Sequence, residues 1–107
     1  MTIELDDQPC LSVDDVEAFK VDLTAHLGSD SLSGSPTVAL VTADTDVTIG
    51  TPANNTATYV DKDGDTVAIG KAVEFTFTST STGSHQLLIT ATTAARTIKR
   101  LLGVTVE

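Results

Sequence analysis

The fold is decided by a short stretch in which apolar and polar residues alternate strictly, Val73-Glu74-Phe75-Thr76-Phe77. Successive side chains of a β-strand point to opposite faces, so Val73, Phe75 and Phe77 share one face and the polar residues between them share the other. Two of the three phenylalanines of the chain lie on that apolar face. We therefore expect this strand to form the centre of the hydrophobic core.

Further segments on both sides of this stretch have the composition of β-strands. Threonine occurs nineteen times, and β-branched residues favour the pleated, half-buried surface of a sheet. The candidate strands cover residues 37–42, 46–49, 56–60, 66–70, 85–92 and 97–106. Turn-forming residues separate them about every ten residues, which is typical of all-β domains. This spacing predicts an immunoglobulin-like antiparallel β-sandwich.

Three local features of these strands follow from their residues. Asp63-Gly64 lies between two β-rich runs, and glycine accepts a positive φ without a clash, so residues 56–69 are expected to form a hairpin. In the last strand the alternation is regular only in two halves, and Gly103 is predicted to mark a bulge where it shifts. His85 shares a face with the apolar residues that follow it, which places it at the edge of the core.

The N-terminal third fits both a helix and a strand. Ser12, followed by an acid three positions later, is a helix N-cap signal, and apolar residues then recur at helical spacing as far as Gly28. Residues 19–27 also alternate with a period of two. We favour a short irregular or helical N-terminal arm over residues 1–15, then a strand over 17–27, with the sandwich covering 16–107.

Composition and charge limit the class of protein. The 107 residues suffice for one domain, and a hydrophobic content of 40% is enough for a packed core. The net charge of −9 repels phosphate groups, so we expect neither nucleic acid nor a membrane as a partner. No run is long and apolar enough to span a membrane, and the first residues lack the basic and apolar regions of a signal peptide.

The charge is distributed unevenly along the chain. Residues 1–65 carry a net charge of −11, whereas residues 66–107 carry +2, with Arg96, Lys99 and Arg100 near the end. Opposed charges suit head-to-tail self-association or docking on an oppositely charged protein. Folding can also bring the two halves side by side and cancel them, and we favour this second interpretation.

Few residues offer catalytic chemistry. The only histidines are His26, expected to be exposed, and His85, and nothing near Cys10 supplies a positive charge that would activate its thiol. One cysteine and two histidines are too few for a zinc pattern. We therefore expect a protein that is not an enzyme and has no cofactor and no metal.

One cluster of acids resembles a metal-binding loop. Asp61, Asp63 and Asp65 match the first half of a calcium-binding loop, but Ala72 stands where such a loop places its bidentate glutamate. A solvated hairpin tip explains these residues better than a calcium site. A calcium- or carbohydrate-binding β-sandwich stays an alternative that would use the three aspartates.

The N-terminal arm offers the only candidate site. Ile3, Leu5 and Leu11 are apolar residues in an acidic context with no evident route to a core. We expect them to form a protein interface by docking on a neighbouring subunit. The alternative is a frayed terminus without a specific contact.

Two blocks of the chain resemble the small immunoglobulin-like virion proteins of tailed bacteriophages. Residues 16–33, from Val16-Glu17-Ala18-Phe19 to Ser33, resemble the opening of that group. The block from Val73 through the Gly83-Ser84-His85 turn to Arg96-Thr97-Ile98-Lys99-Arg100 resembles its close. Members of the group are fibre-tail adaptors or neck and tail accessory proteins.

The resemblance implies a structural role in a virion. We expect a head-tail neck or tail-fibre adaptor that contacts connector, tail or fibre subunits in a symmetric ring. Its location would be the virion, after synthesis in the host cytoplasm. A capsid decoration protein is the alternative within the same class.

Overall fold

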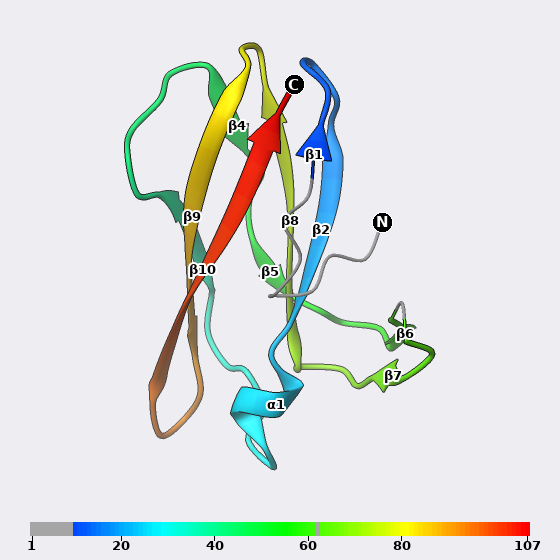
Figure 1. Cartoon of the computed structure of the whole chain (residues 1–107). Coiled ribbons are helices and arrows are strands. Elements are labelled where there is room, and N and C mark those ends of the chain that lie inside the picture. Colours follow the sequence, from blue (N-terminus) through cyan, green and yellow to red (C-terminus); the bar gives the residue numbers. More distant parts are fainter. Residues whose placement is uncertain (1–9, 62) are drawn as a thin grey trace.

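The strand predicted to carry the core, β8 (Ala72–Ser79), lies at the centre of one of two packed sheets (Figure 1). The computed structural model describes residues 10–61 and 63–107. The other elements are β1 (Cys10–Leu11), β2 (Glu17–Asp22), α1 (Thr24–Leu27), β3 (Thr37–Leu40), β4 (Val47–Ile49), β5 (Ala53–Asn54), β6 (Tyr59–Val60), β7 (Thr66–Val67), β9 (Gly83–Thr92) and β10 (Thr97–Val106). No helix in the described part of the chain is long and apolar enough to cross a membrane.

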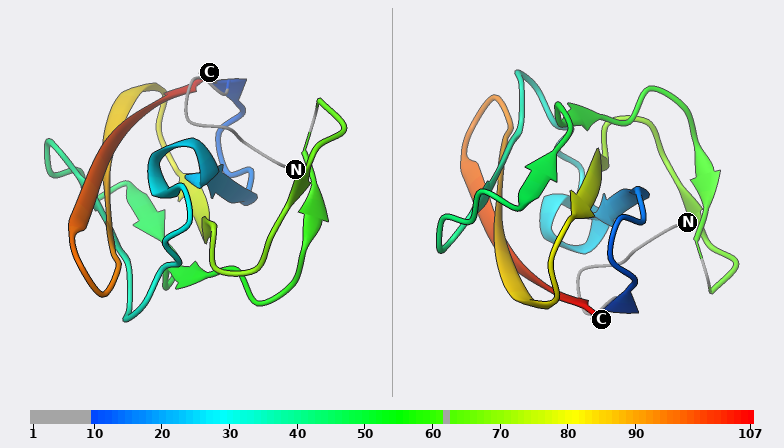
Figure 2. Two further views of the ribbon diagram at one scale, coloured as in Figure 1. Left: turned by 90° about the horizontal axis from the view of Figure 1, so that it is seen from below. Right: turned by 90° about the horizontal axis from the view of Figure 1, so that it is seen from above.

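The two sheets form an all-β sandwich, as the sequence predicts. One sheet has the order β2-β8-β4. β5 also pairs with β8, at residues 73–74, whereas β4 pairs with residues 77–79. The other has the order β1-β10-β9-β3. Every pairing is antiparallel except that of β1 with β10. Seen along the strands, the sheets face each other and the β6–β7 hairpin stands to one side (Figure 2).

The core lies between the two sheets. Phe19 of β2 packs edge-on against Phe75, at 5.3 Å between ring centroids, and stacks on Phe77 at 6.0 Å. The opposite sheet contributes buried apolar residues of β9 and β10, among them Leu87 and Leu102. Each large side chain buried in this way contributes about 1.5–3 kcal/mol. Because β8 supplies both Phe75 and Phe77 to this core, the expectation that it carries the heart of the core is confirmed.

β10 contains no bulge at Gly103, and that prediction is wrong. Its pairing with β9 keeps one register from Thr97 to Val106. Alternate residues of β10 face the core throughout, but one of those inward positions is Arg100 instead of an apolar residue. The Arg100 side chain bonds to His26 Nδ1 at 2.6 Å, which explains how a charged residue occupies this face.

The N-terminal third contains both a strand and a turn of helix. β2 confirms the predicted strand as far as Asp22, but residues 24–27 form α1, so the strand predicted to reach residue 27 is too long. The Asp22 carboxylate accepts bonds from the backbone N–H of Thr24 at 2.9 Å and from its hydroxyl at 2.6 Å. Asp22 thus turns the chain out of the sheet, and Gly28, at φ 58°, ends the helical turn.

The described part of the predicted arm belongs to the sandwich. Leu11 is only 6% exposed and lies in the core, so its assignment to a protein interface is wrong. β1 pairs with β10, and the Leu11 carbonyl accepts a bond from the Glu107 N–H at 2.7 Å. This pairing carries Leu11 over the end of the core, a route that local sequence does not reveal. Ile3 and Leu5 lie outside the described residues.

The predicted hairpin is confirmed, with β6 paired to β7. A single side chain anchors its base, because Asn55 is 2% exposed and makes four hydrogen bonds. Its amide donates to the carbonyls of Ala57, at 3.1 Å, and Ala68, at 2.9 Å. Its oxygen accepts from the backbone N–H groups of Lys71 and Ala72, both at 3.0 Å. Asn55 therefore ties the loop before the hairpin to the start of β8.

Candidate functional site

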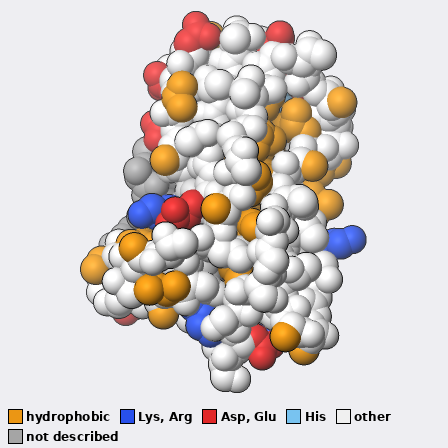
Figure 3. Space-filling view, turned by 180° about the vertical axis from the view of Figure 1, so that it is seen from behind, with side chains coloured by type: hydrophobic (Ala, Val, Ile, Leu, Met, Phe, Trp, Pro, Cys, Tyr) orange, Lys and Arg blue, Asp and Glu red, His pale blue; other side chains and the backbone are white. Residues whose placement is uncertain are grey.

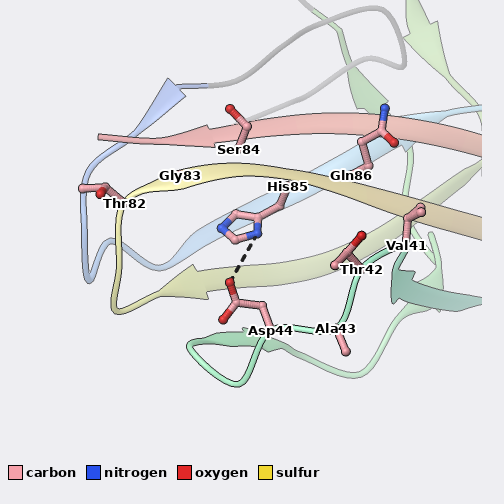
Figure 4. A pocket seen from close by; sticks show the side chains of 9 residues that line it. All are labelled: Val41, Thr42, Ala43, Asp44, Thr82, Gly83, Ser84, His85 and Gln86. Atoms are coloured by element: carbon pink, nitrogen blue, oxygen red, sulfur yellow. Dashed lines mark ion pairs between the residues drawn. The ribbon is translucent and has the colours of Figure 1, made fainter.

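The candidate site begins where the chain leaves β3 and crosses to the other sheet. The Val41 N–H still donates to the Gln86 carbonyl at 2.9 Å, but the next residues turn away from β9. The departing loop and residues 82–86 enclose a pocket of about 390 Å³ (Figure 4). Thr42, Asp44, Thr82 and His85 are among the residues that line it.

His85 lies between the sheets at the inner side of this pocket, and the prediction of a histidine at the core edge is confirmed. Its side chain is 8% exposed, and its ring centroid lies 6.1 Å from that of Phe77. Nδ1 lies 3.9 Å from Asp44 Oδ2, which is too long for a hydrogen bond. Nε2 is buried and has no hydrogen-bond partner. The imidazole is therefore buried with neither nitrogen bonded.

One acidic residue, Asp44, lines this pocket, and further acidic residues lie at the same end of the sandwich. We call this region the acidic end, and it comprises Asp14, Asp15, Glu17, Asp44, Asp46 and Glu107. Backbone hydrogen bonds join the segments that carry these acids. The Asp14 N–H donates to the Ser79 carbonyl, and the Thr80 N–H donates to the Asp46 carbonyl. Residues 12–17, 41–47 and 79–85 contain no lysine or arginine. The acidic end therefore has no basic residue within its own segments.

The opposite end of the sandwich carries Lys71, Arg96 and Arg100, whose side chains bond to the segment around α1. Arg96 donates to the carbonyls of His26 and Leu27, and its Nε lies 3.3 Å from Asp30 Oδ2. Lys71 donates to the carbonyls of Gly28, at 3.0 Å, and Asp30. We call α1 with Lys71, Arg96 and Arg100 the basic end. His26 is half-buried here, so the prediction that it is exposed is wrong.

The two sequence halves of opposite charge are interleaved in the fold. β1, β2 and β3 pair with β10, β8 and β9, respectively, and Asp30 pairs with Arg96. The expectation that folding brings the halves side by side is confirmed at the basic end. It does not hold at the acidic end, where only acidic residues converge.

A second surface feature is the open edge between the two sheets. β3 and β4 are edge strands, and their Val38, Leu40, Val47 and Ile49 are partly buried against the core. We call these four residues the β3–β4 seam. On this side of the molecule, Figure 3 shows apolar side chains along a hollow that runs between the two sheets. In the part of the chain that the structure describes, no strand pairs with the outer edge of β3.

The three aspartates of the hairpin tip shape the turn. Asp61 Oδ1 accepts bonds from the backbone N–H groups of Asp63 and Asp65, both at 2.9 Å. Among the described residues, no group of three His, Cys, Asp or Glu side chains is placed to hold a metal ion. The Asp61 carboxylate is thus committed to the backbone of its own loop.

Sequence reasoning did not identify two of the features that organise this molecule. Nothing in the local sequence marks Asn55 as an anchor, because a buried amide whose backbone partners lie up to 17 residues away has no local signature. The pocket was not predicted either, since it is formed by loops 40 residues apart in sequence. The sign of the charges in residues 12–17 and 44–46 was the available signal for the acidic end.

Comparisons with known proteins bear on the fold. No protein-family model and no curated protein matches the chain. Among solved structures, the solution structure of Amebosin is similar, with a TM-score of 0.52 and 11% sequence identity. The match covers 99% of this chain and 96% of that one. At this identity the likeness extends to the fold alone, and it supports the β-sandwich.

Proposed function

We propose that this protein is a structural component of a phage virion, a head-tail neck or tail-fibre adaptor that bridges connector or tail subunits to fibres. The observation that carries this proposal is the β3–β4 seam, where edge strands and apolar side chains are open to a partner. The sequence resemblance of residues 16–33 and 73–106 to virion proteins supplies the class of partner.

The outer edge of β3 has the geometry that strand addition requires. Because the Val41 N–H bonds to Gln86, the residues of β3 that bond to β9 are the alternate ones, Thr37 and Ala39. The N–H and C=O groups of Val38 and Leu40 therefore point away from β9. A strand of a partner can pair with these groups while its side chains enter the seam.

The strand order supports an immunoglobulin-like form of the sandwich. The orders β2-β8-β4 and β3-β9-β10 are those of the B-E-D and C-F-G sheets of immunoglobulin-like domains. In immunoglobulin-like domains, variable-type members add further strands beside strand C, which corresponds to β3. The same edge in this protein is proposed as the site where a partner supplies the strand.

A ring of copies multiplies a weak contact of this kind. When several copies lie on one symmetric particle, each further contact is intramolecular, and the total affinity rises without any new contact type. The protein would then act through shape and multiplicity. The second candidate, a capsid decoration protein, uses the same edge but a different number of copies.

Quantitative mass spectrometry of purified phage particles that carry the gene tests the proposal. About six or twelve copies per particle, cross-linked to connector, tail or fibre subunits, are expected for an adaptor. Copies in the hundreds would identify the decoration protein instead. Absence of the chain from particles in which the gene is expressed would contradict both.

A pair of variants tests the edge itself. Val38→Pro removes the outward N–H donor and Val38→Ala removes the same packing but keeps the donor, so the two isolate strand addition. We expect Val38→Pro to reduce incorporation into particles at least several-fold below Val38→Ala. Equal incorporation of the two variants would show that the β3 edge does not pair with a partner.

A further inference from the structure

We propose that the acidic end is a docking surface for a basic segment of another protein, and that an arginine or lysine side chain of that segment enters the pocket beside Asp44 and His85. This inference concerns the chemistry of a partner at one end of the sandwich. It does not depend on the strand addition proposed at the β3–β4 seam.

The charge distribution favours a cationic partner. Asp14, Asp15, Asp46 and Glu107 are exposed, and Glu17 and Asp44 are partly exposed. The longest extent of the molecule is 39 Å, and α1, to which the groups of the basic end bond, lies at the opposite end of the sandwich from the C-terminus (Figure 1). Screening in physiological salt extends over about 8 Å, so the distant basic groups do not neutralise the acidic end. Its carboxylates therefore present a negative field to an approaching protein.

The pocket adds a specific acceptor set to this field. Asp44 Oδ1 accepts a bond from the Asp46 N–H at 2.9 Å, while Oδ2 faces His85, and the Asp44 side chain is 33% exposed. The distance of 3.9 Å between Asp44 Oδ2 and His85 Nδ1 is too long for a hydrogen bond between these two atoms. A guanidinium or ammonium group carries only donors, so it can satisfy the carboxylate oxygen and an unprotonated Nδ1 together.

The strand beside the pocket contributes a backbone acceptor. Successive residues of an antiparallel strand direct their N–H and C=O groups to alternate edges. Gln86 bonds to Val41 on the pocket side of β9, so Ser84, two residues earlier, turns its backbone groups to that same side. The carbonyl of Ser84 therefore lies at the edge of β9 that lines the pocket. A planar guanidinium can bond to it and to Asp44 together.

His85 is the independent sign of a ligand. Its side chain is more than nine-tenths buried, and Nε2 has no hydrogen-bond partner. Buried polar groups in folded proteins are almost always bonded, because an unpaired one is costly. The nitrogen that faces Asp44 in the pocket is Nδ1, and a bond to it from a cationic side chain would give this buried ring a hydrogen-bond partner that it lacks in the isolated chain.

Two other occupants fit the observations less well. A second copy of this chain would have to offer its basic end, where Lys71, Arg96 and Arg100 already bond to the segment around α1 and the exposed Lys99 is left as the cation without such a bond among the described residues. A metal ion would need further ligands, and no third His, Cys, Asp or Glu joins Asp44 and His85 among the described residues. A basic segment of a different protein requires neither.

NMR titration of the isotope-labelled full chain with a hexa-arginine peptide tests the proposal. In about 50 mM salt, we expect the largest amide shifts in residues 41–46 and 82–86, and they should weaken in about 300 mM salt. A hexa-glutamate peptide should produce none. Shifts centred on another surface, or no shifts at low salt, would overturn the proposal.

Charge-matched variants separate the pocket from general attraction to an acidic protein. Asp44→Asn keeps Oδ1 as an acceptor and should weaken peptide binding about tenfold, because the partly buried charge is lost. Asp14→Asn with Asp46→Asn should weaken it about threefold. The control is Asp63→Asn with Asp65→Asn at the hairpin tip, which removes the same charge and should change affinity less than twofold. Equal losses in the two double variants would contradict a site at the acidic end.

Further measurements distinguish the other occupants. If Asp44→Asn fails to fold, Thr42→Lys places an ammonium group at the exposed mouth of the pocket and should also weaken peptide binding. The same amide shifts on addition of zinc or calcium ions alone would identify a metal site and overturn the proposal. Shifts at the acidic end on concentrating the chain alone would identify a second copy as the partner, with the same consequence.

Discussion

The two ends of the sandwich use their charges differently. At the basic end, Lys71 and Arg96 donate to backbone carbonyls of the segment around α1, and Arg96 also pairs with Asp30. At the acidic end, six carboxylates lie in segments that contain no lysine or arginine, and the Asp44 carboxylate lies 3.9 Å from the imidazole of His85 without a hydrogen bond to it. One end thus uses charge to hold its own backbone, and the other leaves charge unpaired.

This difference indicates which end can change without loss of the fold. Helix C-terminal carbonyls have no partner within the helix, so basic side chains that bond to them stabilise the chain. Carboxylates close to one another with no cation between them repel, and they contribute no stability. We expect substitutions at the basic end to lower the free energy of unfolding and neutralisation at the acidic end to leave it unchanged or raise it.

The largest expected effect is at the loop that adjoins the basic end. Asn55→Ala removes four hydrogen bonds and leaves the buried N–H of Ala72 and the partly buried N–H of Lys71 without an acceptor. We expect the free energy of unfolding to fall by about 3–5 kcal/mol in urea denaturation. The control is Asn54→Ala, which loses one exposed bond to Gly34 and should cost about 1 kcal/mol or less. Similar losses in the two variants would show that burial of Asn55 is unimportant.

The next effect tests the bonds to the helix carbonyls. Arg96→Gln removes the ion pair with Asp30 and shortens the donor that reaches His26 and Leu27. Because half of the Arg96 side chain is exposed, we expect a loss of only about 1 kcal/mol in thermal unfolding. Lys99→Gln, which neutralises an exposed neighbour, should change stability by less than about 0.5 kcal/mol. A larger loss in Lys99→Gln would contradict the division of roles at this end.

A smaller effect of opposite sign is expected at the pocket. His85→Phe replaces a buried imidazole that has an unpaired nitrogen by an apolar ring next to Phe77. The free energy of unfolding should rise by up to about 1 kcal/mol, since no buried polar atom is left unbonded. Chemical denaturation measures this change, and the hexa-arginine titration should show weaker binding. Marked destabilisation would mean that the imidazole has a structural role.

The smallest effect concerns the surface charges of the acidic end. Asp14→Asn with Asp46→Asn should raise the free energy of unfolding by no more than about 0.5 kcal/mol, because it relieves repulsion. Asparagine also tolerates the positive φ of 67° found at residue 14. Calorimetry at low and high salt should show that the gain disappears as salt increases. A loss of stability at low salt would indicate that these carboxylates are paired in the fold.

Part of the fold could be read from the sequence because its information is local. The alternation at Val73–Phe77 predicts a central strand, and Asp63-Gly64 predicts a hairpin, and the structure confirms both. The errors occur where residues have different local and tertiary environments. Arg100 interrupts an apolar pattern and suggested a shift in phase, although a distant histidine bonds to it. Leu11 lacked an apolar neighbourhood in sequence but is covered in the core by way of β10.

The sequence by itself determined the all-β class, the positions of most strands and the excess of acid, because side-chain periodicity and net charge depend only on the order of residues. Tertiary structure decided that Asn55 is an anchor, that His85 and Asp44 share a pocket, and that the acids gather at one end. These properties arise when strands and loops far apart in the chain are brought together. No local pattern encodes which charges will then meet a partner and which will be left exposed.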